Sequence, residues 1–277
     1  MPVRSSWHQV QGCVRGSVEF ATAVTDEARE FLLQTAPSLF PACVTNVAEG
    51  RLFKGWMSVI QYLGEYLEEH AKDDPERLFA FLDGSDQVWS GCSEEDFIER
   101  YNEIVRRSGA RIVFGAELYC SEPARPCYEV PPVPVWASEL AGIADFATGY
   151  WKQRTRCFTK QGTTRGMENQ CDKTPALRHL NSGFYVGPIG EMRRMVSWAL
   201  ANFHYFMGLG GHQRVFNEYF ARYPERVTLD YTASLVLNLD GIVRDLLQLR
   251  GADVLSPITS KELCFSHAQG GTKKWFT

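Results

Sequence analysis

Short apolar runs alternate with stretches of helical period along the first part of the chain, and this order limits the folds open to it. The predicted strands cover 17–24, 42–47, 78–82 and 112–117, and the predicted helices between them cover 25–36, 53–67 and 93–108. Short apolar runs with polar boundaries suit strands that are buried on both faces. The alternation therefore predicts an α/β fold with a mostly parallel sheet and helices on both faces.

The alternation breaks at about 118–178, a proline-rich and polar segment, and then returns. The later predicted strands cover 180–187, 227–230 and 235–240, and the later helices cover 192–206 and 212–223. A chain of 277 residues that is 44% hydrophobic can bury one full core, so we expect a single domain over 1–277. Long irregular segments inside a domain are usually functional or variable, so 118–178 is predicted to be a substrate-facing lid or a surface insertion.

The charge, the hydrophobic pattern and the cysteines of the chain limit which partners and cellular compartments we expect. The net charge of −4 argues against a duplex nucleic acid partner, which usually requires a basic face. The sequence has no apolar segment of transmembrane length and no apolar signal core at its start. We therefore expect a cytoplasmic protein as the chain stands, or a protein of the endoplasmic reticulum lumen if a signal was removed. The eight cysteines form no C-x-x-C pair, which argues against structural zinc. Disulfides are expected mainly among the four cysteines in the range from Cys120 to Cys171.

The apolar run 78–82 ends at two carboxylates, Asp83 and Asp86, with a glycine and a serine between them. In open α/β sheets, ligands bind at the carboxyl ends of strands. Two neighbouring carboxylates repel each other unless a cation lies between them, so this pair predicts a site for a hard divalent cation that also holds a diphosphate. The alternative is an ordinary surface turn, because Asp, Gly and Ser are common turn residues.

The C-terminal segment supplies further candidate groups. His267 follows a short apolar run, and a nitrogen ligand beside two carboxylates suits Mn²⁺ better than Mg²⁺. Gly270 and Gly271 allow backbone amides to approach phosphate oxygens, and Lys273 can neutralise a diphosphate. The structural alternatives are a core histidine, a tight turn and solvated lysines.

Several segments, in chain order, resemble the glycosyltransferase domain of the procollagen lysyl hydroxylase and glucosyltransferase family, which has a GT-A fold. They include Phe53-Lys-Gly-Trp56, Phe81-Leu-Asp-Gly-Ser-Asp-Gln-Val88, Val113-Phe-Gly-Ala-Glu-Leu-Tyr-Cys120, Leu180-Asn-Ser-Gly183, Leu237-Asn-Leu-Asp-Gly241 and His267-Ala-Gln-Gly-Gly-Thr-Lys273. No one segment is specific, but their shared order over most of the chain is hard to obtain by chance.

The resemblance implies a role for each matching position. Asp83, Asp86 and His267 would hold the metal. The nucleotide-sugar site would comprise Thr25, Lys54, Asp83, Ser85, Asp86, Gly183, Gly270 and Lys273. Asn181 and His212 would lie at the reacting centre, and Trp56 would contact the acceptor or, alternatively, belong to the core face of its helix.

Two positions depart from the family pattern. Ser85 replaces an aromatic residue that can stack on the nucleotide base in relatives, so base packing would come from elsewhere. Gly211 and His212 replace an acidic pair near the reacting centre or the acceptor. The replacement leaves three interpretations: a different acceptor, His212 as a base or hydrogen-bond donor, or lost activity.

Together these features predict a Mn²⁺-dependent glycosyltransferase, with Mg²⁺ as the other candidate metal. It would transfer glucose or galactose from a UDP-sugar to a hydroxyl acceptor. The resemblance points to hydroxylysine or galactosyl-hydroxylysine of a collagen-like protein. One alternative is an inactive module that binds a sugar nucleotide or a partner protein on the same fold. Another is a metal-dependent phosphohydrolase.

Overall fold

The computed structural model describes residues 16–25, 43–84, 86–118, 131–137, 177–203, 211–240, 248–250, 253–256 and 258–269. Its strands are β1 (Val18–Thr22), β2 (Val44–Asn46), β3 (Leu78–Leu82), β4 (Gln87–Trp89), β5 (Ile112–Glu117), β6 (His179–Pro188), β7 (Val227–Asp230), β8 (Val236–Asn238), β9 (Gln248–Arg250), β10 (Asp253–Leu255) and β11 (Phe265–His267). Its helices are α2 (Trp56–His70), α3 (Glu94–Ser108), α7 (Ile189–Asn202) and α8 (Gly211–Arg222). The predicted helix at 25–36 and most of the predicted lid or insertion at 118–178 lie outside the described residues.

Six strands form the central sheet in the order β2-β1-β3-β6-β5-β7. β6 runs antiparallel to both of its neighbours, whereas the other five strands run in one direction. The fold is therefore α/β with a mostly parallel sheet, as the sequence predicts and as the resemblance to GT-A enzymes implies. Within the described residues, no helix has both the length and the apolar content that a membrane crossing requires.

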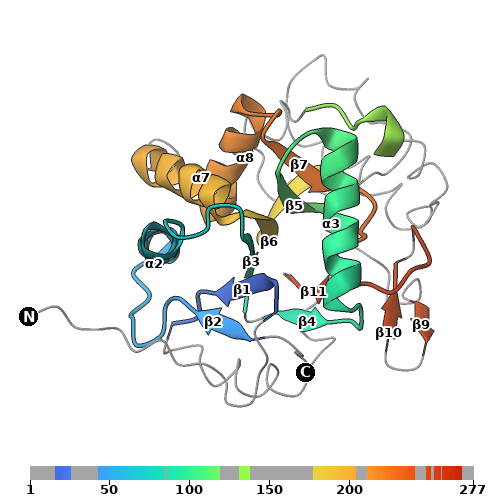
Figure 1. The fold of residues 1–277 in the computed structure, drawn as a ribbon, viewed down its shortest axis with the longest axis horizontal. Helices are drawn as coiled ribbons and strands as arrows, with labels where there is room; N and C mark the ends of the chain where they lie inside the picture. The colour runs from blue at the N-terminus through green and yellow to red at the C-terminus, as the bar shows by residue number, and fades with distance from the viewer. Residues whose placement is uncertain are drawn as a thin grey trace, which may run out of the picture.

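Helices cover both faces of the central sheet, which is also as predicted (Figure 1). On one face, α2, α7 and α8 pack over a core that includes Phe81, Phe114 and Tyr185. On the other face, α3 packs over a second core that includes Phe20 and Phe184. Both cores are built from aromatic and aliphatic side chains that the strands project alternately to either face.

Local signals in the sequence set the bounds of α3. The Ser93 hydroxyl accepts a hydrogen bond from the Asp96 backbone amide, and the Asp96 carboxylate accepts one from the Ser93 amide. Gly109 ends the helix at a φ of 76°, and its N–H donates to the Val105 carbonyl at 2.8 Å. A capping box at the start and a left-handed glycine at the end are the signals that the sequence carries.

The start of α2 differs from the prediction. The helical period places Phe53 and Trp56 on the buried face, but Phe53 precedes the helix and Trp56 opens it. Both side chains are exposed, at 41% and 49%. The reason is geometric: the buried face begins one turn later, at Val59, Ile60 and Leu63.

A second, three-stranded sheet in the order β4-β11-β8 is not predicted from the sequence, apart from β8. β11 pairs antiparallel with β4 and parallel with β8, so residue 267 lies opposite residues 87 and 238. The Phe265 side chain of this sheet packs against Phe20 and Phe184 of the central sheet. This contact holds the small sheet against the face that α3 also covers.

The direction of β6 brings two groups of residues to one edge of the central sheet. Asp83 follows the carboxyl end of β3, and Glu117 closes β5. Because β6 runs the other way, its first half lies at this same edge: His179 pairs with Glu117, and Phe184 pairs with Leu82. This is the edge at which ligands bind in open α/β sheets.

Candidate metal centre

Two carboxylates from one turn and a histidine from a distant part of the chain meet at this edge. One carboxylate oxygen each of Asp83 and Asp86 and one ring nitrogen of His267 lie within 4.8 Å of one another. The side chains of Asp86 and His267 are almost fully buried, at 4% and 3% exposure. The structure thus brings together the three residues that the sequence nominates as metal ligands.

Backbone hydrogen bonds hold the segments that carry these groups. The Asp83 N–H donates to the Gly183 carbonyl of β6 at 2.7 Å, which extends the β3–β6 pairing by one residue. The Ala268 N–H donates to the Asp86 carbonyl at 2.8 Å, which ties the end of β11 to the turn before β4. The carboxylates and the imidazole therefore stand on paired backbone.

The two ring nitrogens of His267 have different partners. Nδ1 lies 2.7 Å from Asn238 Oδ1, and Nε2 lies 3.2 Å from Asp86 Oδ1. Burial lowers the pKa of His267, but the hydrogen bond to Asp86 and the charges of Asp86, Asp83 and Glu117 outweigh burial and raise that pKa above its ordinary value. The site therefore favours a positive charge at the position that Nε2 faces.

The donor set fits a divalent cation. Two carboxylates and one imidazole, with Nε2 directed at the carboxylates, are ligands that Mn²⁺ accepts. A methyl group on Gly84 would come within 2.6 Å of the Val24 side chain, and one on Gly183 would come within 2.7 Å of His267 Nε2. The glycines on both sides thus leave room for the ligands. In addition, the buried Oε1 of Gln87 has no hydrogen-bond partner within the described residues.

A buried carboxylate that the sequence analysis gave no role lies beside this group. Glu117 accepts hydrogen bonds from Asn181 Nδ2 at 2.9 Å, Gln213 Nε2 at 2.7 Å and Gln269 Nε2 at 3.4 Å. Burial raises its pKa to about 7, although the three amide donors and the charge of His267 act in the opposite direction. Its position after an apolar strand is the signal that also marks Asp83.

Both ends of the Asn181 side-chain amide form hydrogen bonds in the network around Glu117. Its Nδ2 donates to Glu117, and its Oδ1 accepts the Gly183 N–H at 2.8 Å. The side chain is 4% exposed. The amide thus links the Glu117 carboxylate to the backbone of β6 next to the metal-ligand group.

His212 and Trp56 form a second, more exposed group beside the first. Their ring centroids are 5.1 Å apart, and the Trp56 ring also lies against Gly211. Burial lowers the pKa of His212 to about 4 even though a hydrogen bond to the Ser182 backbone raises it, so the ring is neutral at pH 7. Because Ser182 precedes Gly183, this aromatic group is connected to the metal-ligand group through β6.

The other predicted site residues fall into two sets. Thr25 is buried just after β1, and Lys54 is exposed just before α2, where its backbone N–H donates to Ser58 Oγ at 3.1 Å. Ser85, Gly270 and Lys273 lie outside the described residues. The nucleotide-binding roles of all five stay predictions.

Comparisons with known proteins add one structural likeness. No protein-family model matches the chain, and no curated protein matches it. Among solved structures, the chain is similar to the apo form of mouse xyloside xylosyltransferase 1, at 14% identity and a TM-score of 0.44. The match covers 94% of this chain and 88% of that chain. A likeness of this size does not identify a family or a substrate for this chain.

Proposed function

We propose that this chain is a Mn²⁺-dependent glycosyltransferase of the GT-A type that transfers a hexose from a UDP-sugar to a hydroxyl acceptor. The observation that carries the proposal is the convergence of Asp83, Asp86 and His267 at the ligand-binding edge of the sheet. His267 is far from the two aspartates in the sequence, and burial of the Asp86 carboxylate beside a second carboxylate is costly without a neutralising cation.

Asp83, Asp86 and His267 would hold the metal, with Mg²⁺ as the other candidate. When bound, the cation would neutralise the donor diphosphate and stabilise the UDP leaving group. Glu117 and Asn181 would keep the sugar side of the site rigid, since each group is already held by hydrogen bonds. Thr25, Lys54, Ser85, Gly270 and Lys273 are proposed to contact the nucleotide or its phosphates.

The acceptor would bind over Trp56 and His212. Trp56 is half-exposed, so it can present its ring to a ligand instead of filling the core. A pKa near 4 makes His212 a weak base, which favours a hydrogen-bonding role over proton abstraction. From the sequence resemblance, hydroxylysine and galactosyl-hydroxylysine peptides are the first acceptors to test.

The decisive experiment measures UDP release from UDP-glucose, UDP-galactose and UDP-xylose with Mn²⁺, with and without an acceptor. UDP release with a hexose donor that rises with acceptor concentration supports the proposal. The variants Asp83→Asn, Asp86→Asn and His267→Ala should lose both Mn²⁺ binding and turnover. Asp73→Asn removes an exposed carboxylate outside the site and serves as the control.

Other outcomes would change the proposal. If the protein binds no nucleotide in the presence of Mn²⁺, the proposal is wrong. Binding without turnover on a broad acceptor panel would favour the inactive binding module. UDP release that is independent of every acceptor would favour a hydrolase.

A further inference from the structure

Asn238 uses both ends of its side-chain amide. Its Nδ2 donates to the Ala116 carbonyl of β5 at 2.9 Å, and its Oδ1 lies 2.7 Å from His267 Nδ1. The residue is fully buried, with no exposed surface. The amide therefore connects the central sheet to the imidazole that the proposed function assigns to the metal.

The Ala116 carbonyl fixes which way the amide points. A carbonyl oxygen only accepts hydrogen bonds, so the amide nitrogen must face it. The amide oxygen then faces His267 Nδ1, which must carry a proton in order to donate. Turning the amide over would place two oxygens face to face and would lose this hydrogen bond. In the neutral ring, Nε2 is left with a free lone pair directed toward Asp86.

The backbone around Asn238 is shaped for this contact. A methyl group on Gly115 would come within 2.9 Å of Asn238 Nδ2 and 3.0 Å of Val236, so only glycine admits the amide here. The β5–β6 register also shifts between Phe114 and Gly115, just before the carbonyl that Asn238 contacts. Such irregularities often redirect groups near functional sites.

We infer that Asn238 is the positioning residue that fixes the tautomer and orientation of His267 for metal binding. This inference rests on the proposed function, because it assigns His267 Nε2 to the metal. Histidine ligands commonly donate their second N–H to a carboxylate or carbonyl group, and loss of such a partner typically weakens metal binding roughly 10–100-fold. Here the side-chain amide of Asn238 provides that acceptor.

Two variants separate positioning from simple packing. Asn238→Leu removes both hydrogen bonds while keeping the same branched shape, and should weaken Mn²⁺ binding by roughly 10–100-fold. Asn238→Asp keeps an acceptor for Nδ1 but loses the donor to Ala116. It should bind Mn²⁺ within a fewfold of the wild type, although both variants should unfold at a lower temperature.

Mn²⁺ affinity is measured by titration calorimetry, and thermal unfolding is followed in the presence of a chelator. As a control, Gly187→Ala strains β6 against the Arg111 backbone, at the end of the strand away from His267. It should lower stability and leave Mn²⁺ affinity unchanged. If Mn²⁺ affinity instead follows stability through all three variants, Asn238 is only a packing residue and the inference fails.

A second measurement keeps the inference independent of the metal. In protein labelled with ¹⁵N-histidine and freed of metal, the ring of His267 is assigned by comparison with His267→Ala. At a pH where the ring is neutral, a proton on Nδ1 supports the inference, and a bare Nδ1 overturns it. If the wild type binds no Mn²⁺, the proposed function fails, and this spectrum alone decides the role of Asn238.

Discussion

The imidazole of His267 lies directly against the backbone of Gly183, in the middle of a strand. An added methyl group would meet Nε2 at 2.7 Å and Nδ1 at 2.9 Å. Real Cβ atoms almost never approach other atoms so closely, so a larger residue must displace the ring. The sequence resemblance assigns Gly183 to the nucleotide-sugar site, and the structure adds a reason for glycine that does not depend on the sugar.

We predict that Gly183→Ala lowers Mn²⁺ affinity at least about 10-fold, because the displaced ring no longer faces Asp86. It should also destabilise the fold by about 1–3 kcal/mol, as overpacking usually does. Calorimetric Mn²⁺ titration and urea unfolding measure the two effects. Unchanged Mn²⁺ affinity in Gly183→Ala would show that the ring has another way to reach the metal.

The raised pKa of Glu117 predicts that the stability of the fold depends on pH. Burial raises its pKa to about 7, from about 4.5 when the carboxyl is in the unfolded chain. Between these values the native state binds more protons than the unfolded state, so this group makes stability fall as pH rises from about 4.5 to 7. Below the unfolded pKa, both states are protonated and the penalty is absent.

The variant Glu117→Gln stays neutral throughout and should not show this loss. Relative to the variant, the wild type should lose roughly 2–3 kcal/mol of unfolding free energy between pH 4.5 and 8. Urea unfolding of both proteins in a chelator measures the difference. A gap between the two proteins that is constant with pH would mean that the pKa of Glu117 is the same in the folded and the unfolded chain.

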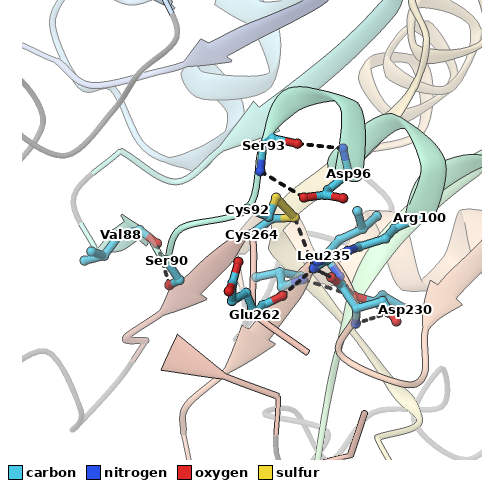
Figure 2. Close-up of a disulfide and its surroundings, with 12 residues drawn as sticks. Val88, Ser90, Cys92, Ser93, Asp96, Arg100, Asp230, Leu235, Glu262 and Cys264 are labelled. Atoms are coloured by element: carbon cyan, nitrogen blue, oxygen red, sulfur yellow. Dashed lines mark hydrogen bonds between the residues drawn. A yellow bond between two sulfur atoms is a disulfide. The ribbon is translucent and has the colours of Figure 1, made fainter. Parts of the chain in front are cut away.

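At the scale of elements, the small sheet β4-β11-β8 positions the candidate centre, and the disulfide Cys92–Cys264 closes one end of it. The two sulfurs are bonded and fully buried, and Cys264 immediately precedes β11. Arg100 of α3 donates to Cys264 Sγ at 3.6 Å and also to the carbonyls of Ser234, at 2.9 Å, and Glu262 (Figure 2). The crosslink therefore joins the segment between β4 and α3 to the strand that carries His267.

Replacing both cysteines with alanine should lower the unfolding free energy by about 2–5 kcal/mol. Fraying should begin where the tether was, so the Phe265 N–H, which donates to the Leu235 carbonyl at 2.8 Å, should exchange faster. Amide hydrogen exchange measures this protection. Ser93→Ala, next to Cys92, removes only the cap of α3 and should leave the Phe265 amide protected.

The long elements were predictable from the sequence because each contains its own signal. A fifteen-residue helix such as α3 has several turns of period plus two caps, and β3 has an uninterrupted apolar run. Strands β4 and β11 have three residues each, which is too short for any period. Their pairing also depends on segments far apart in the chain. Local patterns therefore could not reveal the small sheet.

In the candidate site, too, some features have a local sequence signal and others depend on contacts between distant segments. Asp83 follows an apolar run, so its position at a strand end could be predicted, and Asp86 follows it in the same turn. His267 could be nominated as a ligand, but its strand β11 could not be predicted. The role of Asn238 depends on the pairing of β8 with β11, which places its amide beside His267, 29 positions away. The sequence does not show this pairing. Glu117 has the signal of a strand end, but its raised pKa results from burial that no local pattern reports.

At the scale of the whole molecule, the two sheets meet over one edge. The central sheet contributes Asp83, Glu117 and Asn181, and the small sheet contributes Asn238 and His267. The contacts between them include the side chains of Phe265 and Phe184, and the amide of Asn238 against β5. Anything that loosens the small sheet should therefore weaken the metal site before the central sheet unfolds.

Because the metal site depends on the small sheet, the disulfide at one end of that sheet should affect how well the protein folds in different compartments. Disulfides form and persist in oxidising compartments, whereas reducing compartments keep thiols reduced, so the bond Cys92–Cys264 and the disulfide-bonded Cys43 allow a test. We predict that the chain gives more folded, Mn²⁺-binding protein in a bacterial periplasm than in a bacterial cytoplasm. Thiol labelling under denaturing conditions counts the free cysteines in each preparation. The variant with alanine at 92 and 264 should lose most of the periplasmic advantage. Equal yields from the two compartments, with Cys92 and Cys264 reactive in the cytoplasmic protein, would show that the small sheet holds without its tether.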